Sequence, residues 1–473
     1  MKLNNWTNFY LVGIKGVAMT AMAECLLDLG KKVRGSDVAE SFVTETQLRA
    51  LQIKIDQGFA DELPNETQCV IYTAAHQADQ NPQVQAAIKQ NIPVLSHAEA
   101  LGEIFNEYQG IAVSGVGGKS TTSAMIAWIL SQCKKHPAYA VGVGTIIGLS
   151  RTGAVPEDAE FFVAEADEYV TDPAAPQKGE EITPRFHFLK PLVTVCTNLR
   201  FDHPDVYKDF DHTKKVFFEF FHQIKPGGTL IYNQADQELF SKWKGEATPL
   251  TFGTTPHADL SIDLKTLKFQ PGETEAVIKN KKGEEWTLKL GLPGAFNLEN
   301  ALAAILAVQA VGVPIDQAVE ALQDFNSTLR RCQDLGEVRG VQYYDDYAHH
   351  PHEVAKVIHA FKEWYPDQKL VVAFQSHTYS RTKALFDEFV ESFAEAEEVA
   401  MIDIFASARE AADESVSSDL LCEAIAKKFP KIPAVNYHTL LKLAEHLRAL
   451  PPGTVCLTLG AGDIYKVHEM INS

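Results

Sequence analysis

A glycine-rich segment between an apolar run and a helical pattern most limits how this chain can fold. It reads Ser-Gly-Val-Gly-Gly-Lys-Ser-Thr over residues 114–121, after the run Ile111–Val113 and before a predicted helix over residues 123–133. Backbone N–H groups in such a loop, together with the N-terminus of the helix, converge on one place and favour an anion there. Lys119 would add a positive charge beside terminal phosphates, and the Ser120 hydroxyl could bind Mg²⁺. The segment therefore predicts a site for a nucleoside triphosphate.

The glycine spacing departs from the standard phosphate-loop pattern. That pattern has Gly six positions before the lysine, where this chain has Val113. The glycines are instead compressed into Gly115, Gly117 and Gly118, and Thr121 completes the segment. An ordinary glycine-rich turn without a ligand is the alternative interpretation. Gly-Lys-Ser-Thr at the start of a helix favours phosphate binding over that alternative.

Apolar strand patterns alternate with helical patterns along almost the whole chain, which is typical of parallel α/β folds. The length of 473 residues predicts about three domains. We expect a Rossmann-like N-terminal domain over residues 1–109 and a central P-loop ATPase-like α/β domain over residues 110–328. The latter includes a β-rich segment near residues 250–290. A C-terminal Rossmann-like α/β domain would follow over residues 329–473.

Composition excludes several classes of function. A formal net charge of −19 argues against nucleic acid as the main partner, because a phosphate backbone requires a basic face. No apolar run reaches the roughly 20 residues that a membrane span needs, and no secretory signal is visible. The seven cysteines are scattered without CxxC spacing, so they predict neither a zinc site nor a redox motif. We therefore expect a cytoplasmic protein that acts on small molecules, without nucleic-acid or membrane partners.

The N-terminal domain begins with a strand pattern, a short glycine loop and a helix. Gly13 and Gly16 lie in this loop, and Asp37 follows the second predicted strand. Only two of the three glycines of the dinucleotide fingerprint are present, which makes an NAD site a weak prediction. A bound diphosphate over the loop, with Asp37 nearby, fits the residues better. A Rossmann-like turn without a ligand remains the alternative.

Acidic and histidine residues follow two further apolar runs in the central domain. Glu165 and Asp167 come directly after the run at residues 161–164, and Asp202 and His203 follow the run at residues 192–196. Ligand sites in open parallel sheets lie outside the carboxyl ends of the strands. Since Mg²⁺ prefers oxygen ligands, Glu165 or Asp167 could hold it against phosphates. His203 could bind a second metal ion or orient the substrate, although solvated loops would account for the same residues.

Two polar loops follow predicted strands in the C-terminal domain, over residues 345–351 and 375–382. His377 and Arg381 are four positions apart at the predicted start of a helix, so they should share a face. Such a pair could clamp a carboxylate, because Arg offers a bidentate fork. A capped helix with a surface arginine is the alternative.

Taken in order, these motifs resemble those of the Mur ligase family, the ATP-dependent amide ligases of peptidoglycan precursor synthesis. The resemblance covers nearly the whole chain. It departs from the usual family pattern at Val116, Gly117 and Phe296. The matching segments are Gly13–Met19, Gly35–Asp37, Gly115–Thr122, Glu165–Glu168, Thr197–Asn198, Asp202–His203, Asn297, Asn300, Arg330–Arg331, Asp345–Pro351, Gln375–Arg381 and Leu459–Ile464.

The resemblance implies a reaction that consumes ATP, with Mg²⁺ as cofactor. The lactyl carboxylate of UDP-N-acetylmuramate would be joined to the amine of L-alanine through an acyl phosphate, by a monomer or homodimer. A related recycling ligase, which attaches a tripeptide to the same sugar nucleotide, is an alternative. A P-loop regulatory protein that hydrolyses ATP without forming an amide is an alternative of another class.

The resemblance also implies roles for individual residues. It implies catalytic roles for Lys119, Glu165 and His203, and metal binding by Ser120, Glu165 and His203. It assigns UDP-sugar binding to Gly13, Gly16 and Asp37, and amino-acid binding to His377 and Arg381. The residues expected to bind ATP are Gly115, Gly117, Gly118, Lys119, Ser120, Thr121, Asn297, Asn300, Arg331 and Asp346.

Overall fold

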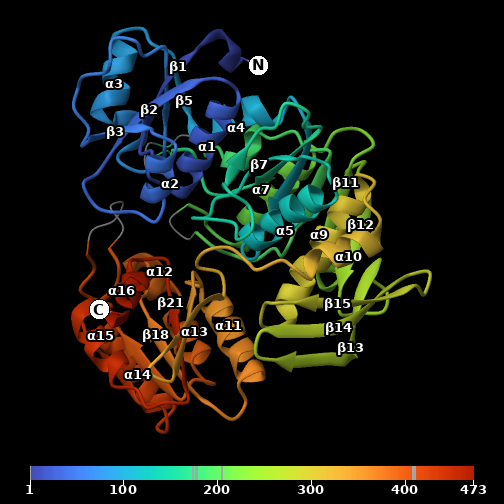
Figure 1. Cartoon of the computed structure of the whole chain (residues 1–473), viewed down its shortest axis with the longest axis vertical. Helices are drawn as coiled ribbons and strands as arrows, with labels where there is room; N and C mark the ends of the chain where they lie inside the picture. The colour runs from blue at the N-terminus through green and yellow to red at the C-terminus, as the bar shows by residue number, and fades with distance from the viewer. Residues whose placement is uncertain are drawn as a thin grey trace. The chain divides into compact units, whose positions relative to one another are not determined.

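The computed structural model describes residues 2–472 apart from 173–174, 176–178, 180, 204–205 and 407–411. Three sheets, with helices between most of their strands, give the predicted three-domain α/β fold (Figure 1). The chain divides into two compact units, and each is described by itself. The first unit comprises Met1–Asp263, Val277–Leu288 and Glu299–Phe325, and the second comprises Leu264–Ala276, Lys289–Leu298 and Asn326–Ser473.

The N-terminal sheet has five parallel strands in the order β3-β2-β1-β4-β5. The apolar run that predicted the first strand forms β1, whose residues 9–12 are all buried in the middle of the sheet. Strand order reverses beside β1, so the loop after it lies at a topological switch point, where such sheets bind ligands. The strands are β1 (Asn8–Val12), β2 (Lys32–Asp37), β3 (Lys54–Gln57), β4 (Cys69–Tyr72) and β5 (Val94–Ser96), and the helices are α1 (Val17–Asp28), α2 (Glu45–Ala50), α3 (Pro82–Lys89) and α4 (His97–Phe105).

The central sheet has ten strands in the order β15-β14-β13-β12-β11-β10-β6-β9-β7-β8. Its core is β6, which pairs in parallel with β9 on one side and β10 on the other. The predicted β-rich segment is confirmed as β12–β15. The strands are β6 (Gln109–Ser114), β7 (Ala138–Ala140), β8 (Gly153–Ala154), β9 (Phe161–Glu165), β10 (Val193–Cys196), β11 (Thr229–Asn233), β12 (Thr248–Gly253), β13 (Leu260–Gln270), β14 (Glu273–Asn280) and β15 (Glu285–Leu290).

Helix α5 follows the glycine loop and begins at Lys119, four residues before the predicted helix (α5, Lys119–Gln132). Every residue from 120 to 130 is buried, because the helix packs on the sheet and against α10 (Ile315–Leu322). The indole N–H of Trp128 donates to the carbonyl of Ala321 at 2.7 Å. This burial holds the N-terminus of α5 in place at the loop. The structure also describes α7 (Phe210–Phe221), α8 (Gln237–Phe240) and α9 (Ala295–Ala310).

Within the first unit, α1 of the N-terminal sheet packs against the β7–β8 hairpin of the central sheet. Glu24 is fully buried there and accepts hydrogen bonds from the backbone N–H groups of Thr152 and Gly153, at 3.0 and 2.8 Å. A side chain on Gly153 would overlap the carbonyl oxygen of Ala21, so this close approach requires glycine. Burial raises the pKa of Glu24, although the hydrogen bonds oppose the shift.

The sheet of the second unit has six strands in the order β16-β17-β21-β18-β19-β20. All neighbours are parallel except β16 and β17. Both predicted polar loops lie at its carboxyl edge, after β17 and β18. The strands are β16 (Gln333–Val338), β17 (Val341–Asp346), β18 (Lys369–Phe374), β19 (Glu398–Met401), β20 (Ala434–Asn436) and β21 (Thr454–Leu459), and the helices are α11 (Pro351–Trp364), α12 (Tyr379–Ala384), α13 (Phe386–Ser392), α14 (Ser418–Lys428), α15 (Leu440–Arg448) and α16 (Val467–Asn472).

Among the described residues, no helix has both the length and the apolar character that crossing a bilayer would need.

Candidate functional site

The glycine loop between β6 and α5 is held by the two residues that follow β10. The Thr197 hydroxyl and the Asn198 amide both donate to the carbonyl of Gly117, at 2.5 and 2.9 Å, and the Asn198 side chain accepts from the Gly117 N–H at 3.3 Å. Gly115 has φ +123°, and a Cβ there would overlap Thr197 Oγ1 and lie 2.8 Å from the Asn198 carbonyl oxygen. Gly118 has φ +83° and lies against the Asn300 side chain. These conformations require glycine and keep the loop open to an anion.

Lys119 directs its ammonium group toward carboxylates of the first unit. Its Nζ donates to the Gly115 carbonyl at 2.6 Å and to the two carboxylate oxygens of Glu168 at 3.0 and 2.9 Å. Burial opposes the charge on Lys119, but the surrounding carboxylates outweigh it, above all Glu168, and raise the lysine's pKa. Lys119 is therefore charged over the whole physiological range, as phosphate binding needs.

Glu165 and Asp167 follow β9 at the same edge of the sheet. In the β6–β9 register Glu165 is opposite Val113, one residue from the end of β6, so its carboxylate lies beside the start of the loop. It accepts from the Gly142 N–H at 2.9 Å. Asp167 accepts from Arg185 at 2.5 Å, and although burial disfavours its charge, Arg185 and Lys119 hold the pKa of Asp167 well below its usual range.

His203 joins the same group from the loop after β10. Its backbone is left-handed, with φ +56°, and its N–H donates to Asp202 Oδ1 at 2.7 Å. His203 Nε2 lies 3.5 Å from Glu168 Oε1, and the imidazole packs against the Tyr169 ring with centroids 4.9 Å apart. Glu168 thus contacts both Lys119 and His203. Sequence reasoning gave no individual role to Glu168. Its signals were its place in an acidic run after a buried strand and in the segment Glu165–Glu168 that resembles the family.

Ser120 and Glu165, two of the three residues predicted to bind the metal, fit a hard divalent cation by their chemistry. Ser120 occupies the second position of α5 and is buried with Thr121 at the base of the loop. Its hydroxyl, together with the carboxylates after β9, supplies the oxygen ligands that Mg²⁺ prefers. Asn300, from α9, is brought to this group through its contact with Gly118.

The predicted UDP-sugar loop is organised by Asp37, which is 1% exposed. Its carboxylate accepts from the backbone N–H groups of Lys15 and Val38, at 2.7 and 2.8 Å. The Lys15 ammonium turns away from the loop, donating to the carbonyls of Val38 and Glu40 and pairing with Glu45 at 2.6 Å. Asp37 therefore shapes the Gly13–Gly16 loop. The N–H groups left at the start of α1 are suited to a diphosphate.

In the second unit, the two neighbouring arginines have different surroundings. Arg330 is tied into the fold, because its guanidinium pairs with Asp345 at 2.9 Å and donates to the carbonyls of Gly460 and Gly462. Arg331 lies over the Tyr347 ring at 4.8 Å. Arg330 lies over the same ring at 5.2 Å, and the assignment of Arg331 to the nucleotide stays a prediction.

Asp346 and Asn297 are both buried by local hydrogen bonds in the second unit. Asp346 accepts from the N–H groups of Cys332 and Ala348, each at 2.7 Å. Burial raises the pKa of Asp346, and Arg331 opposes the shift. Asn297 donates to the Pro293 carbonyl at 2.8 Å. Both predicted ATP residues therefore hold backbone segments in place.

His377 and Arg381 lie together, although not as the sequence predicts. The expectation of one shared helix face is wrong, because Thr378 caps α12 and leaves His377 outside the helix. Arg381 instead reaches back, and its Nη1 donates to the His377 carbonyl at 3.0 Å. The His377 ring stacks on Phe405 with centroids 5.5 Å apart. The binding of an amino-acid carboxylate by these two residues stays a prediction.

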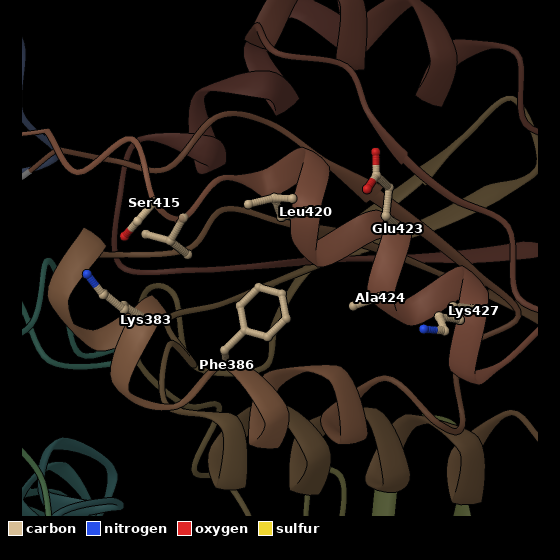
Figure 2. Close-up of a pocket in the computed structure, with 8 residues that line it drawn as sticks. Lys383, Phe386, Ser415, Leu420, Glu423, Ala424 and Lys427 are labelled. Carbon is tan, nitrogen blue, oxygen red and sulfur yellow. The ribbon is translucent and has the colours of Figure 1, made fainter.

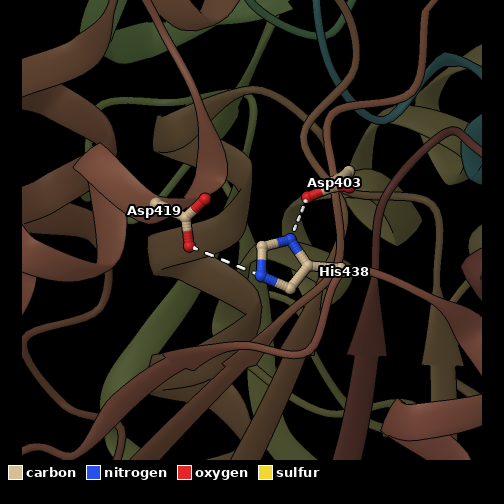
Figure 3. A group of neighbouring side chains, drawn as sticks. All are labelled: Asp403, Asp419 and His438. Atoms are coloured by element: carbon tan, nitrogen blue, oxygen red, sulfur yellow. Dashed lines mark hydrogen bonds and ion pairs between the residues drawn. The ribbon is translucent and has the colours of Figure 1, made fainter.

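Two other features of the second unit contain no predicted site residue. Figure 2 shows an open pocket of about 440 Å³ between α13 and α14, with Phe386 and Leu420 facing its interior. Figure 3 shows His438 between two aspartates, with Nδ1 2.9 Å from Asp403 and Nε2 3.9 Å from Asp419. All three side chains of this cluster are exposed.

Comparisons with known proteins agree with the order of these motifs. Models of the Mur ligase family catalytic domain, the Mur ligase middle domain and the Mur ligase glutamate ligase domain match residues 8–109, 113–308 and 330–462. The UDP-N-acetylmuramate–L-alanine ligase of Desulfitobacterium hafniense is 34% identical, over 98% of this chain and 99% of its own length. The enzyme of the same name from Clostridium novyi is also 34% identical, over 99% and 98%.

Solved structures match the whole fold. The UDP-N-acetylmuramate–alanine ligase of Thermotoga maritima has a TM-score of 0.79 at 24% identity, covering 98% of both chains. A murein peptide ligase from Psychrobacter arcticus has a TM-score of 0.69 at 20% identity, again over 98% of both chains. The sequence matches at 34% identity over almost the full length place the chain in a family: it belongs to the Mur ligases.

Proposed function

We propose that this chain is an ATP-dependent ligase that joins L-alanine to UDP-N-acetylmuramate in peptidoglycan precursor synthesis. The observation that carries the proposal is the glycine loop, which presents the Lys119 ammonium beside Glu168 and His203 in a chain of this family. The full-length relatives that bear the name of this activity support the choice of substrates.

The reaction needs activation, because a carboxylate does not expel an oxide leaving group. Transfer of the γ-phosphoryl group of ATP to the lactyl carboxylate forms an acyl phosphate and ADP. The amine of L-alanine then attacks the acyl carbon and loses a proton, and the tetrahedral oxyanion collapses to an amide and inorganic phosphate. Positioning and charge neutralisation supply most of the catalysis in such phosphoryl transfers.

Residues of the first unit take roles in that transfer. Lys119 would contact the β- and γ-phosphates, and the N–H groups of Gly115, Gly118 and the start of α5 would surround them. Gly117 would have to release its N–H from Asn198 to donate to a phosphate. Ser120 and Glu165 would hold Mg²⁺, which would neutralise phosphate charge, and His203 would hold a second Mg²⁺ or contact the acyl phosphate. Thr121 and Asn300 complete the nucleotide site, and Gly13, Gly16 and Asp37 form the site for the UDP-sugar.

Residues of the second unit take the remaining roles. Asn297, Arg331 and Asp346 contact ATP, and His377 with Arg381 binds the carboxylate of the amino acid. We propose domain boundaries at 1–109, 110–328 and 329–473, which the matched ranges of the three family domains support. We also propose a cytoplasmic monomer or homodimer, since ATP and nucleotide sugars are substrates of that compartment and the seven cysteines are free thiols.

The test measures phosphate release from ATP in the presence of Mg²⁺ and UDP-N-acetylmuramate, with either L-alanine or the tripeptide as the amine. Mass spectrometry identifies the amide formed. We expect L-alanine to drive phosphate release and to yield the L-alanine amide. Product from the tripeptide alone would assign the chain to the recycling ligases. ATP hydrolysis that L-alanine leaves unchanged, with no amide, would identify a regulatory ATPase instead.

A further inference from the structure

We infer that Glu168 is a positioning residue that holds Lys119 and His203 together and competes with phosphate for the Lys119 ammonium. The inference rests on the proposed ATP-dependent function and adds to it a residue with no assigned role. It concerns contacts within the first unit alone.

The contacts of Glu168 show how firmly it is placed. The residue is 1% exposed, and the Tyr207 hydroxyl donates to its backbone carbonyl. Its carboxylate contacts Lys119 through both oxygens, at 3.0 and 2.9 Å, and Oε1 also lies 3.5 Å from His203 Nε2. A carboxylate that contacts both the first residue of α5 and the loop after β10 fixes the separation of those two groups.

The two neighbouring acids, Asp167 and Glu165, also make contacts with groups other than Lys119. Asp167 pairs with Arg185 at 2.5 Å, and Glu165 accepts from the Gly142 N–H. Within the run 165–168, Glu168 directs both carboxylate oxygens to the lysine of the phosphate loop. The Glu168 side chain is 2% exposed and that of Lys119 15%, so their Coulomb attraction is screened less than that of a surface pair.

This geometry sets up a competition for one ammonium group. The three N–H bonds of Lys119 are directed to Gly115 and to the two oxygens of Glu168. A phosphate oxygen that binds Lys119 has to displace at least one of these contacts. The carboxylate of Glu168 therefore weakens nucleotide binding, while its remaining contact keeps the lysine at the correct place for phosphoryl transfer.

The experiment removes the charge of Glu168 while keeping its shape. Glu168→Gln is compared with the unchanged protein and with Glu157→Gln, which removes one exposed negative charge from the same domain. Binding of a non-hydrolysable ATP analogue with Mg²⁺ is measured by calorimetry, without sugar nucleotide or amino acid. Turnover is measured separately by phosphate release.

We expect the two readouts of Glu168→Gln to move in opposite directions. The Kd of the analogue should fall about threefold to tenfold, the equivalent of one net hydrogen bond. The kcat should fall about 10- to 100-fold, as for other groups that orient a ligand-binding residue. Glu157→Gln should change neither quantity. A purely structural role would lower the folded fraction and leave the Kd of the folded protein unchanged.

Two results would overturn the inference. A Kd that rises together with the loss of turnover would make Glu168 a direct ligand of the bound metal or nucleotide. Unchanged Kd and kcat would remove any role. If Glu168→Gln does not fold, Glu168→Asp is tested instead, because it keeps the charge on a shorter side chain. Glu168→Asp should retain the parent Kd and have a reduced kcat. A kcat equal to that of the parent would contradict the positioning role. Because the binding arm contains no acceptor substrate, failure of L-alanine ligation would refute the proposed function without affecting this comparison.

Discussion

Gly115→Ala is the substitution whose cost follows most directly from the structure. The φ of +123° at Gly115 lies where side chains are rarely accommodated, which costs about 1–2 kcal/mol. The added Cβ would also meet main-chain atoms of Asn198, two residues after β10, at 2.8 Å from O and 3.0 Å from N. Overpacking of this kind costs about 1–3 kcal/mol. We expect a total loss of about 2–5 kcal/mol, partly relieved by displacement of the phosphate loop.

Gly227→Ala provides the control, because Gly227 has φ +78° and no other group lies within 4 Å of the place that an added Cβ would occupy. It should lose only the conformational part, about 1–2 kcal/mol. Urea unfolding midpoints measure both losses, and calorimetry with an ATP analogue measures the state of the loop. Only Gly115→Ala should weaken nucleotide binding. Equal urea midpoints and equal affinities for the ATP analogue in the two variants would refute the argument that Gly115 packs too closely on Thr197 and Asn198 to accept a side chain.

Three further predictions concern single side chains. Lys119→Ala should abolish ligation. It should also destabilise the protein by about 3–5 kcal/mol, because it leaves the buried Glu168 carboxylate without its partner. The double variant Lys119→Ala/Glu168→Gln should recover stability in urea unfolding but should not recover activity. Arg381→Ala should raise the KM for L-alanine far more than that for ATP in the phosphate-release assay, and equal changes would remove Arg381 from the amino-acid site. Burial raises the pKa of Glu24, so the folded state favours its protonated form, and this contribution to stability is lost as pH rises through the raised pKa. The free energy of unfolding of Glu24→Gln is compared with that of the parent from below pH 4.5 to pH 7. The variant should become more stable relative to the parent as pH rises, and a difference that stays constant with pH would contradict the raised pKa.

The strands and the loops that follow them could be predicted from the sequence, because buried parallel strands are apolar runs that end in polar residues. The run 161–164 forms most of β9, and Glu165 stands at its end as expected. The helical pattern places the start of α5 four residues too late. Gly118 is the N-cap of α5, and Lys119 is already its first helical residue. Propensity marks where a helix is favoured, whereas tertiary contacts decide where it begins.

The partners of the candidate residues could not be predicted, since they depend on how separate loops approach one another. Glu168 meets Lys119 across 49 positions of sequence. Asn198 meets Gly117 across 81 positions. His377 lies outside its predicted helix because Thr378 supplies the cap, a local preference that competes with the four-residue spacing.

The buried aspartates of the two Rossmann-like sheets limit what loss of activity can reveal about ligand contacts. Asp37 is the last residue of β2, and Asp346 is the last residue of β17. In each aspartate, both carboxylate oxygens accept hydrogen bonds from backbone N–H groups of nearby loops. Replacing either aspartate with asparagine substitutes an N–H donor for one of those acceptors, so the loop must shift whether or not a ligand is present. Lost activity in Asp346→Asn would therefore not by itself show a contact with ATP. A contact is shown only if ligand affinity falls by more than the loss of unfolding free energy of the same variant accounts for.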